Sequence, residues 1–216
     1  MKTKAIIFDL DGVITNTEDY HYLAWKAVTD EWGLSFDPVF NENLKGISRM
    51  NSLEMILVHN NVADRYTAEE KEILCAKKND LYVKSIADLS PVNILPGIKE
   101  LIDAAKAKGL KLAVASVSKN AKTVLKALEL WDSFDYVADA AKIKKSKPDP
   151  EIFLVCAQAL GVDPGSCIGI EDSRAGIEAI HAAGMKSVGV GVTVTTRRPD
   201  VELFSTAELD LDMITE

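Results

Sequence analysis

The chain has 216 residues, of which 47% are hydrophobic and 27% charged, typical of one large globular domain or a domain with a smaller module. Its net charge of -8 argues against nucleic-acid or anionic-membrane partners. The three cysteines lack metal-type spacing, and no apolar run is long enough for a signal peptide or a membrane span. We therefore expect a soluble cytoplasmic protein.

The first predicted element is a buried strand in the apolar run at residues 5–8. It is followed by Asp9 and Asp11, and Gly12 then permits a sharp turn. Two carboxylates this close repel one another unless a divalent cation, a proton or a basic side chain relieves them. The pair predicts either an acidic site at the carboxyl edge of a sheet or an ordinary solvated Asp-Gly turn.

After this strand the pattern changes to that of helices. Asn16 or Thr17 can cap a first helix, which ends at Gly33. Three further helices are predicted, over 38–45, 50–59 and 67–86. No strand is predicted in this block, so we interpret it as a cap domain inserted into the first crossover. The predicted domains are a catalytic core of residues 1–15 and 92–216 and a helical cap of residues 16–91.

From residue 96 onward, strand and helix patterns alternate, which is typical of a doubly wound parallel sheet. Strands are predicted at 110–116, 136–139, 167–172 and 186–191. Helices are predicted at 98–108, 119–130, 150–160 and 174–183. The fold class is therefore α/β, with a Rossmann-like parallel sheet core and an inserted all-helical cap. Residues from 192 onward have a weak pattern, and no element is predicted there.

Polar residues gather at the expected carboxyl edge of this sheet: Asp9, Asp11, Ser116, Ser118, Lys119, Asn120, Lys147, Glu171 and Asp172. Open α/β sheets bind their ligands at this edge. Carboxylates without histidine or cysteine ligands favour Mg²⁺, and hydroxyl and ammonium groups can neutralise a phosphoryl group in transfer. The set predicts phosphoryl transfer. No Walker-type loop or kinase signature indicates a nucleotide donor.

The motifs Asp9-Leu10-Asp11-Gly12-Val13, Ser116, Lys147-Pro148 and Glu171-Asp172 resemble, in order and spacing, the four motifs of the haloacid dehalogenase superfamily. The resemblance covers nearly the whole chain. It implies an Mg²⁺-dependent phosphotransferase that is transiently a phosphoprotein, with an aspartyl-phosphate intermediate. The helices inserted after the first strand are similar to the helical-cap subclass of that superfamily.

Finer features resemble the phosphosugar mutases of the superfamily. They are the run from Asp9 to Thr15, His21 with Trp25, the run from Leu44 to Arg49, the run from Ala115 to Asn120, and the run from Gly169 to Ser173. The resemblance implies an isomerase of carbohydrate metabolism. It would interconvert β-D-glucose 1-phosphate and D-glucose 6-phosphate through β-glucose 1,6-bisphosphate. We expect a monomer whose partner is a small-molecule phosphosugar.

The resemblance also implies a role for each matching residue. Asp9 would be the nucleophile and Asp11 the general acid/base, with His21 controlling Asp11. Ser116 and Lys147 would orient and neutralise the transferring phosphoryl group. The expected metal ligands are Asp9, Asp11 through its backbone carbonyl, Glu171 and Asp172. The expected substrate-binding and hinge residues are Thr17, Trp25, Lys45, Gly46, Arg49, Ser52, Lys78, Val117, Ser118, Lys119 and Asn120.

Several of these residues also fit a purely structural interpretation. His21 and Trp25 lie four residues apart, as core-packing residues of a helix do. Lys45, Arg49 and Lys78, taken alone, are typical of solvated charges. Similarly, Lys147 could belong to a rigid loop, and the acidic pair at 171–172 could cap the next helix.

Arg49 separates the function hypotheses. A mutase must hold its bisphosphate by one phosphate while the other is transferred, and a guanidinium grips phosphate with two donors. A capped sugar-phosphate phosphatase, the alternative, has no such need. A non-catalytic phosphosugar-binding regulator is the third hypothesis, and the intact nucleophile Asp9 counts against it.

Overall fold

The computed structural model describes residues 2–191 and 198–215. Its centre is a six-stranded sheet in the order β3-β2-β1-β4-β5-β6, and every neighbouring pair is parallel. The strands are β1 (Ala5–Phe8), β2 (Lys111–Val114), β3 (Tyr136–Val137), β4 (Cys167–Glu171), β5 (Lys186–Val190) and β6 (Val201–Leu203). Strand β1 lies between β2 and β4, so the residues that follow these three strands meet at one edge.

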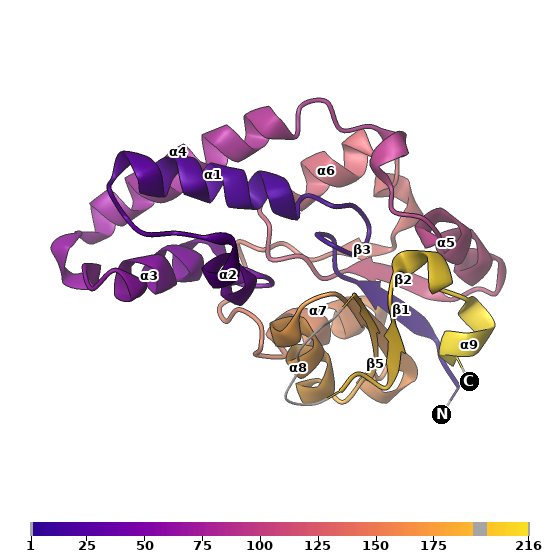
Figure 1. The fold of residues 1–216 in the computed structure, drawn as a ribbon. Coiled ribbons are helices and arrows are strands. Elements are labelled where there is room, and N and C mark those ends of the chain that lie inside the picture. The colour runs from indigo at the N-terminus through magenta and orange to yellow at the C-terminus, as the bar shows by residue number, and fades with distance from the viewer. Residues whose placement is uncertain (1, 192–197, 216) are drawn as a thin grey trace.

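Helices cover both faces of the sheet (Figure 1). One face packs against α5 (Ile98–Ala107), α6 (Ala121–Ala127) and α9 (Leu211–Thr215). The other face packs against α7 (Glu151–Leu160) and α8 (Arg174–Ala182). Alternate β1 side chains point to opposite faces, with Ile6 and Phe8 in the first layer and Ile7 in the second. Burial on both faces explains why the β1 sequence is uniformly apolar.

Four helices between β1 and β2 form a separate layer, which we call the cap (Figure 1). They are α1 (Glu18–Glu31), α2 (Pro38–Asn41), α3 (Arg49–His59) and α4 (Ala68–Ser85). The cap has a hydrophobic core of its own, formed by Trp25, Val28, Phe36, Leu44, Leu53, Ile56, Leu57, Leu74 and Cys75. Short 3₁₀ turns occur at Glu42–Leu44, Ala63–Arg65, Pro91–Asn93, Trp131–Ser133, Pro164–Ser166 and Thr206–Glu208.

Local signals in the sequence explain where the cap helices begin. The Ser48 hydroxyl accepts a hydrogen bond from the Asn51 N–H at the start of α3. Thr67 and Glu70 form a reciprocal capping box at the start of α4. These caps satisfy N–H groups that a helix leaves unpaired in its first turn.

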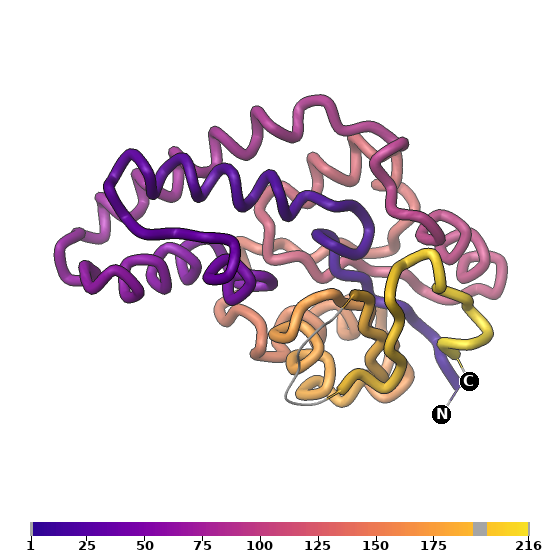
Figure 2. Tube along the Cα trace, in the orientation of Figure 1, coloured from indigo at the N-terminus to yellow at the C-terminus, as the bar shows by residue number. Residues whose placement is uncertain are grey.

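The chain leaves the core for the cap and returns to it through two adjacent segments (Figure 2). The Leu95 N–H donates to the Ile14 carbonyl at 2.9 Å, and the Thr15 hydroxyl donates to the Asn93 carbonyl at 2.8 Å. These bonds tie the outgoing and returning segments together. Motion of the cap relative to the sheet would therefore pivot about this one place.

The predicted α/β fold with an inserted helical cap is confirmed, whereas the division of the chain at 15/16 and 91/92 stays a prediction. Strand β6 and helix α9 were not predicted. Both are short, and Glu202 at the centre of β6 is exposed, so neither has a clear hydrophobic period. The predicted helix at 38–45 is broken into α2 and a 3₁₀ turn. Over the described ranges, no helix is long and apolar enough to cross a membrane.

Truncating the central strand should be costly. Ile6 in β1 is fully buried, whereas Ile73 in α4 is 63% exposed. We expect Ile6→Ala to lower the free energy of unfolding by about 2–5 kcal/mol, because it opens a cavity between the sheet and its helices. Ile73→Ala, the matched control, should change it by less than about 0.5 kcal/mol. Urea unfolding curves measure both values, and equal losses would contradict this account of the core.

Candidate active site

The turn after β1 brings Asp9, Asp11 and Asp172 together. The Asp9 N–H donates to the Ile170 carbonyl at 2.9 Å, which holds the end of β1 against β4. Gly12 has a φ of +80°, and a Cβ built there would lie 2.2 Å from a carboxylate oxygen of Asp172. Only glycine therefore permits both this turn and the approach of Asp172. The prediction of an acidic site, rather than a solvated turn, agrees with this geometry.

Asp9, Glu171 and Asp172 form an acidic cluster whose ligand oxygens lie within 4.8 Å of one another. Glu171 is fully buried and accepts hydrogen bonds from the Asp172 N–H at 2.9 Å and from the Ser173 N–H and hydroxyl, each at 2.8 Å. The buried ammonium of Lys147 donates to Asp9 at 2.6 Å and also to Glu171. These groups come from β1, β4 and the loop before α7, as the motif spacing suggested.

The charges in this cluster do not balance. Burial alone would lower the pKa of Lys147, but Asp9 and Glu171 outweigh burial and raise it, so the ammonium stays charged. Burial raises the pKa of Asp9 to about 8 against the opposing Lys147 charge, and repulsion from Glu171 and Asp11 adds to the rise. Burial and Glu171 also raise the pKa of Asp172. An oxygen-preferring divalent cation would relieve this excess negative charge, and the cluster fits one.

Asp11 is held by groups of the cap and its linker. It accepts a hydrogen bond from the Thr17 hydroxyl and faces His21, whose Nε2 is 3.7 Å away. Of the two predicted N-cap residues, Thr17 occupies the N-cap position of α1, but its side chain makes no cap hydrogen bond. Burial would raise the pKa of Asp11, but the interaction with His21 and the bond from Thr17 outweigh burial and lower that pKa. Asp11 is therefore ionised at neutral pH.

Lys78 in turn orients His21. Its Nζ lies 2.6 Å from His21 Nδ1. When Lys78 is an ammonium it can only donate, and the imidazole proton then lies on Nε2, facing Asp11. Lys78 is 2% exposed and lies against the rings of Trp25 and Tyr82, at 5.4 and 4.9 Å from their centroids. Burial lowers its pKa to about 7, and repulsion from Arg49 adds to the effect. The interpretation of Lys78 as a solvated charge is wrong.

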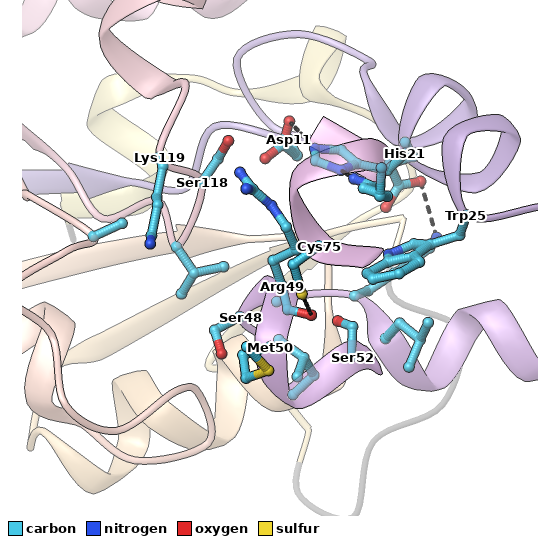
Figure 3. Close-up of a pocket in the computed structure, with 18 of the residues that line it drawn as sticks. Asp11, His21, Trp25, Ser48, Arg49, Met50, Ser52, Cys75, Ser118 and Lys119 are labelled. Carbon is cyan, nitrogen blue, oxygen red and sulfur yellow. Dashed lines mark hydrogen bonds and ion pairs between the residues drawn. The ribbon is translucent and has the colours of Figure 1, made fainter. Parts of the chain in front are cut away.

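A cavity of about 300 Å³ separates the cap from this edge of the sheet (Figure 3). Figure 3 shows Arg49 of α3 extending into it toward Asp11 and Ser118, with Lys119 nearby on the loop after β2. The predicted residues that line it are Asp9, Asp11, His21, Trp25, Lys45, Gly46, Arg49, Ser52, Lys78, Val117, Ser118, Lys119 and Asp172. The cavity therefore carries carboxylates on its core side and cationic groups from both the cap and the core.

Other predicted residues lie behind the cavity wall. They are Thr17, Ser116, Asn120, Lys147 and Glu171. Ser116 is 1% exposed, and its hydroxyl accepts from the Ser118 N–H at 3.1 Å, which fixes the loop after β2. Lys45 lines the cavity, but its ammonium is paired with Glu18 at 2.9 Å and Glu42 at 3.1 Å.

Some residues of the site were not predicted. Asn79 accepts hydrogen bonds from Arg49 at 2.7 Å and from Asn120 at 2.9 Å, and so joins α3, α4 and the loop before α6. Glu72 and Cys75 line the cavity from the same face of α4. Glu72, Cys75 and the pair Lys78 and Asn79 follow one another at intervals of three to four residues. This helical period could have shown that one face of α4 lines the site. Met50 also lines the cavity, without a signal in the sequence.

A comparison of the chain with known protein families agrees with the family that these motifs indicate. Residues 3–184 match the family model described as haloacid dehalogenase-like hydrolase. The chain belongs to this family. The chain is 44% identical over 213 residues to the beta-phosphoglucomutase of Bacillus subtilis. The aligned region covers 99% of this chain and 94% of that protein.

Two further relatives of this haloacid dehalogenase-like chain bear on its function. The crystal structure of beta-phosphoglucomutase from Clostridium difficile superposes with a TM-score of 0.96 and 46% identity, over 98% of this chain and 95% of that one. The fructose-1-phosphate phosphatase of Escherichia coli is 32% identical over 189 residues, covering 86% of this chain and 95% of that enzyme. The same family fold therefore occurs in relatives named as mutases and as phosphatases.

Gly176 of α8 should be indispensable to the acidic cluster. A Cβ built there would lie 1.9 Å from the Glu171 carboxyl carbon. In an exposed helix, replacing glycine by alanine stabilises by about 0.5–1 kcal/mol. We expect Gly176→Ala instead to destabilise by about 1–3 kcal/mol, because Glu171 must move away from Lys147. Urea unfolding measures the change, and the exposed Ala182→Gly in the same helix calibrates the ordinary propensity cost. A gain in stability for Gly176→Ala would contradict this packing.

Burial of Lys78 should make stability depend on pH. Its pKa is about 7 in the folded chain, where His21, Arg49 and Asp11 surround it, and its ordinary value is 10.5. Between these pH values the unfolded chain binds more protons, so the Lys78 contribution favours folding increasingly as pH rises. From pH 7 to 10, we expect the free energy of unfolding of the wild type to rise relative to that of Lys78→Met, by at most about 1.4 kcal/mol per pH unit. Urea unfolding at several pH values tests this, and a constant difference would contradict it.

Proposed function

We propose that this protein is a phosphosugar mutase that interconverts β-D-glucose 1-phosphate and D-glucose 6-phosphate through β-glucose 1,6-bisphosphate. The observation that carries the proposal is the position of Arg49 in the same cavity as Asp9 and Asp11. A second cationic grip, separate from the nucleophile, suits a substrate with two phosphates. The high identity to proteins named beta-phosphoglucomutase, over nearly the whole chain, supports this choice.

In the proposed reaction, a carboxylate oxygen of Asp9 attacks the phosphorus of the bisphosphate, and the bond from phosphorus to the sugar oxygen breaks. Asp11 gives the leaving oxygen the proton that it took from a sugar hydroxyl in the other half-reaction. In the reverse direction Asp11, ionised, takes the proton of a sugar hydroxyl as that oxygen attacks the aspartyl phosphate. The lowered pKa of Asp11, to which its bond from Thr17 contributes, supplies the ionised state that the second role requires.

Mg²⁺ is the cation that we propose for the acidic cluster, held by Asp9, Asp172 and the Asp11 backbone carbonyl, with Glu171 beside them. Bound there, it would offset the negative charge of the phosphoryl oxygens. Lys147 supplies a fixed positive charge at Asp9, and Ser116 fixes the loop that presents Ser118 and Lys119. Arg49, held by Asn79, would bind the phosphate that is not being transferred.

A direct assay tests this function. Purified protein with Mg²⁺ and a trace of β-glucose 1,6-bisphosphate should convert β-glucose 1-phosphate to glucose 6-phosphate, measured by a coupled dehydrogenase. Chelation with EDTA should abolish the conversion, and added Mg²⁺ should restore it. Asp9→Asn should remove it, because an amide cannot form the aspartyl phosphate. Release of inorganic phosphate without isomerisation would favour the phosphatase, and loss of neither activity in Asp9→Asn would contradict the nucleophile.

Arg49→Lys distinguishes a mutase from a monophosphatase. Lysine keeps the charge but loses the paired donors, so we expect kcat/KM for isomerisation to fall by about 10- to 100-fold. Arg65→Lys, an exposed exchange elsewhere in the cap, is the control and should leave the rate unchanged. Full isomerase activity in Arg49→Lys would show that the guanidinium is not needed for holding the second phosphate.

A further inference from the structure

The loop that opens α3 rests on the core beside Lys147. Ser146 belongs to the core, and its hydroxyl accepts two hydrogen bonds from the cap. One comes from the Ser48 N–H and the other from the Asn51 side-chain amide, both at 3.1 Å. The acceptor is the residue directly before Lys147 in the chain.

The same loop also covers the side chain of Lys147. Gly46 has a φ of +72°, and a Cβ built there would lie 3.3 Å from Lys147 Cδ and 2.9 Å from the Ser173 hydroxyl oxygen. The Ser173 hydroxyl donates to Glu171, which in turn accepts from Lys147. The backbone of the cap therefore packs against the aliphatic stem of Lys147 and against the Ser173 hydroxyl, which orients the Glu171 carboxylate.

We infer that Ser146 is a positioning residue that links docking of the cap to the placement of Lys147, an inference that rests on the proposed mutase function. When the cap is docked, two donors fix the Ser146 hydroxyl, and the next residue extends straight into the buried pair with Asp9 and Glu171. If the cap lifts, Ser146 loses both donors and the Lys147 stem loses its cover. Water then reaches the ammonium and the carboxylate that carries the phosphoryl group.

A different cap–core bond joins Asn79 to Asn120, at the loop after β2. That bond stabilises the Arg49 side of the cavity and touches no group beside the nucleophile. Ser146 is different because its neighbour Lys147 contacts Asp9 directly at 2.6 Å. Loosening the Ser146 contact should therefore affect where the phosphoryl group goes, to sugar or to water, and not substrate binding alone.

The test compares Ser146→Ala with Ser146→Thr, which keeps a hydroxyl. For each variant, kcat and KM for isomerisation are measured together with the inorganic phosphate released per glucose 6-phosphate formed. We expect kcat to fall about tenfold in Ser146→Ala, the effect of about one lost hydrogen bond, with a smaller change in KM. Phosphate release per turnover should rise several-fold, and Ser146→Thr should restore both values toward wild type.

Two further variants keep the test decisive. Asn51→Ala removes only one of the two donors, from an exposed residue, and should give a smaller rise in phosphate release. Ser85→Ala is the matched control, because the exposed Ser85 hydroxyl bonds only within its own helix, to the Leu81 carbonyl. It should match wild type in both measurements.

The outcomes separate the two proposals. An isomerising wild type whose release ratio is unchanged in Ser146→Ala and Asn51→Ala would overturn the role of Ser146 and leave the mutase intact. A wild type that only releases phosphate would overturn the mutase. Lys147 would still serve such a phosphatase, so an unchanged kcat for phosphate release in Ser146→Ala would then overturn the positioning role as well.

Discussion

The buried ion pair of Lys147 with Asp9 and Glu171 is the interaction on which the rest of the site depends. An ammonium 1% exposed is tolerable only if both carboxylates reach it, since a lone buried charge costs several kcal/mol. That requirement explains why β1 and β4 are neighbours, since they deliver the two carboxylates to one edge. It also explains Gly176, whose missing side chain leaves room for Glu171, and Gly46, which lets the cap lie against the lysine.

The site contains a second set of charges that belongs largely to the cap. Asp11 comes from the core, but Thr17, His21 and Lys78 control its proton. The two sets push their carboxylates in opposite directions: the pKa of Asp9 is raised by burial and crowding, and that of Asp11 is lowered by its partners. Opposite pKa shifts let two neighbouring acids take different roles in one pocket. Asp9 would need a cation to be ionised as a nucleophile, whereas Asp11 is already ionised and could act as a base.

The sequence was sufficient for strands β1 to β5 and for the inserted cap, because their signals are local. Apolar runs predict buried strands, and Asp9, Lys147 and Glu171 each stand beside such a run or its loop. Contacts between distant segments leave no such signal. Asn79 looks like a surface amide, and Ser146 like part of a basic loop, until the fold brings each against a partner from the other layer. Thr17 stands at the predicted N-cap position, but its hydroxyl binds Asp11 and not the helix, because capping and binding a carboxylate call for the same hydroxyl.

The choice between water and sugar as acceptor cannot be made by the core alone. Asp9, Asp11, Lys147 and the acidic pair would perform the same displacement in a phosphatase, and relatives named as phosphatases share this family. What remains is the cap, which carries Arg49, the group that we propose for a second phosphate, and which contacts the core through Ser146 and Asn79. A hydrolase gains from a cap that admits water, whereas a mutase must keep the aspartyl phosphate dry until a hydroxyl arrives. If this chain is a mutase, its selectivity for sugar over water would therefore depend on weak contacts between two layers, each worth about one hydrogen bond.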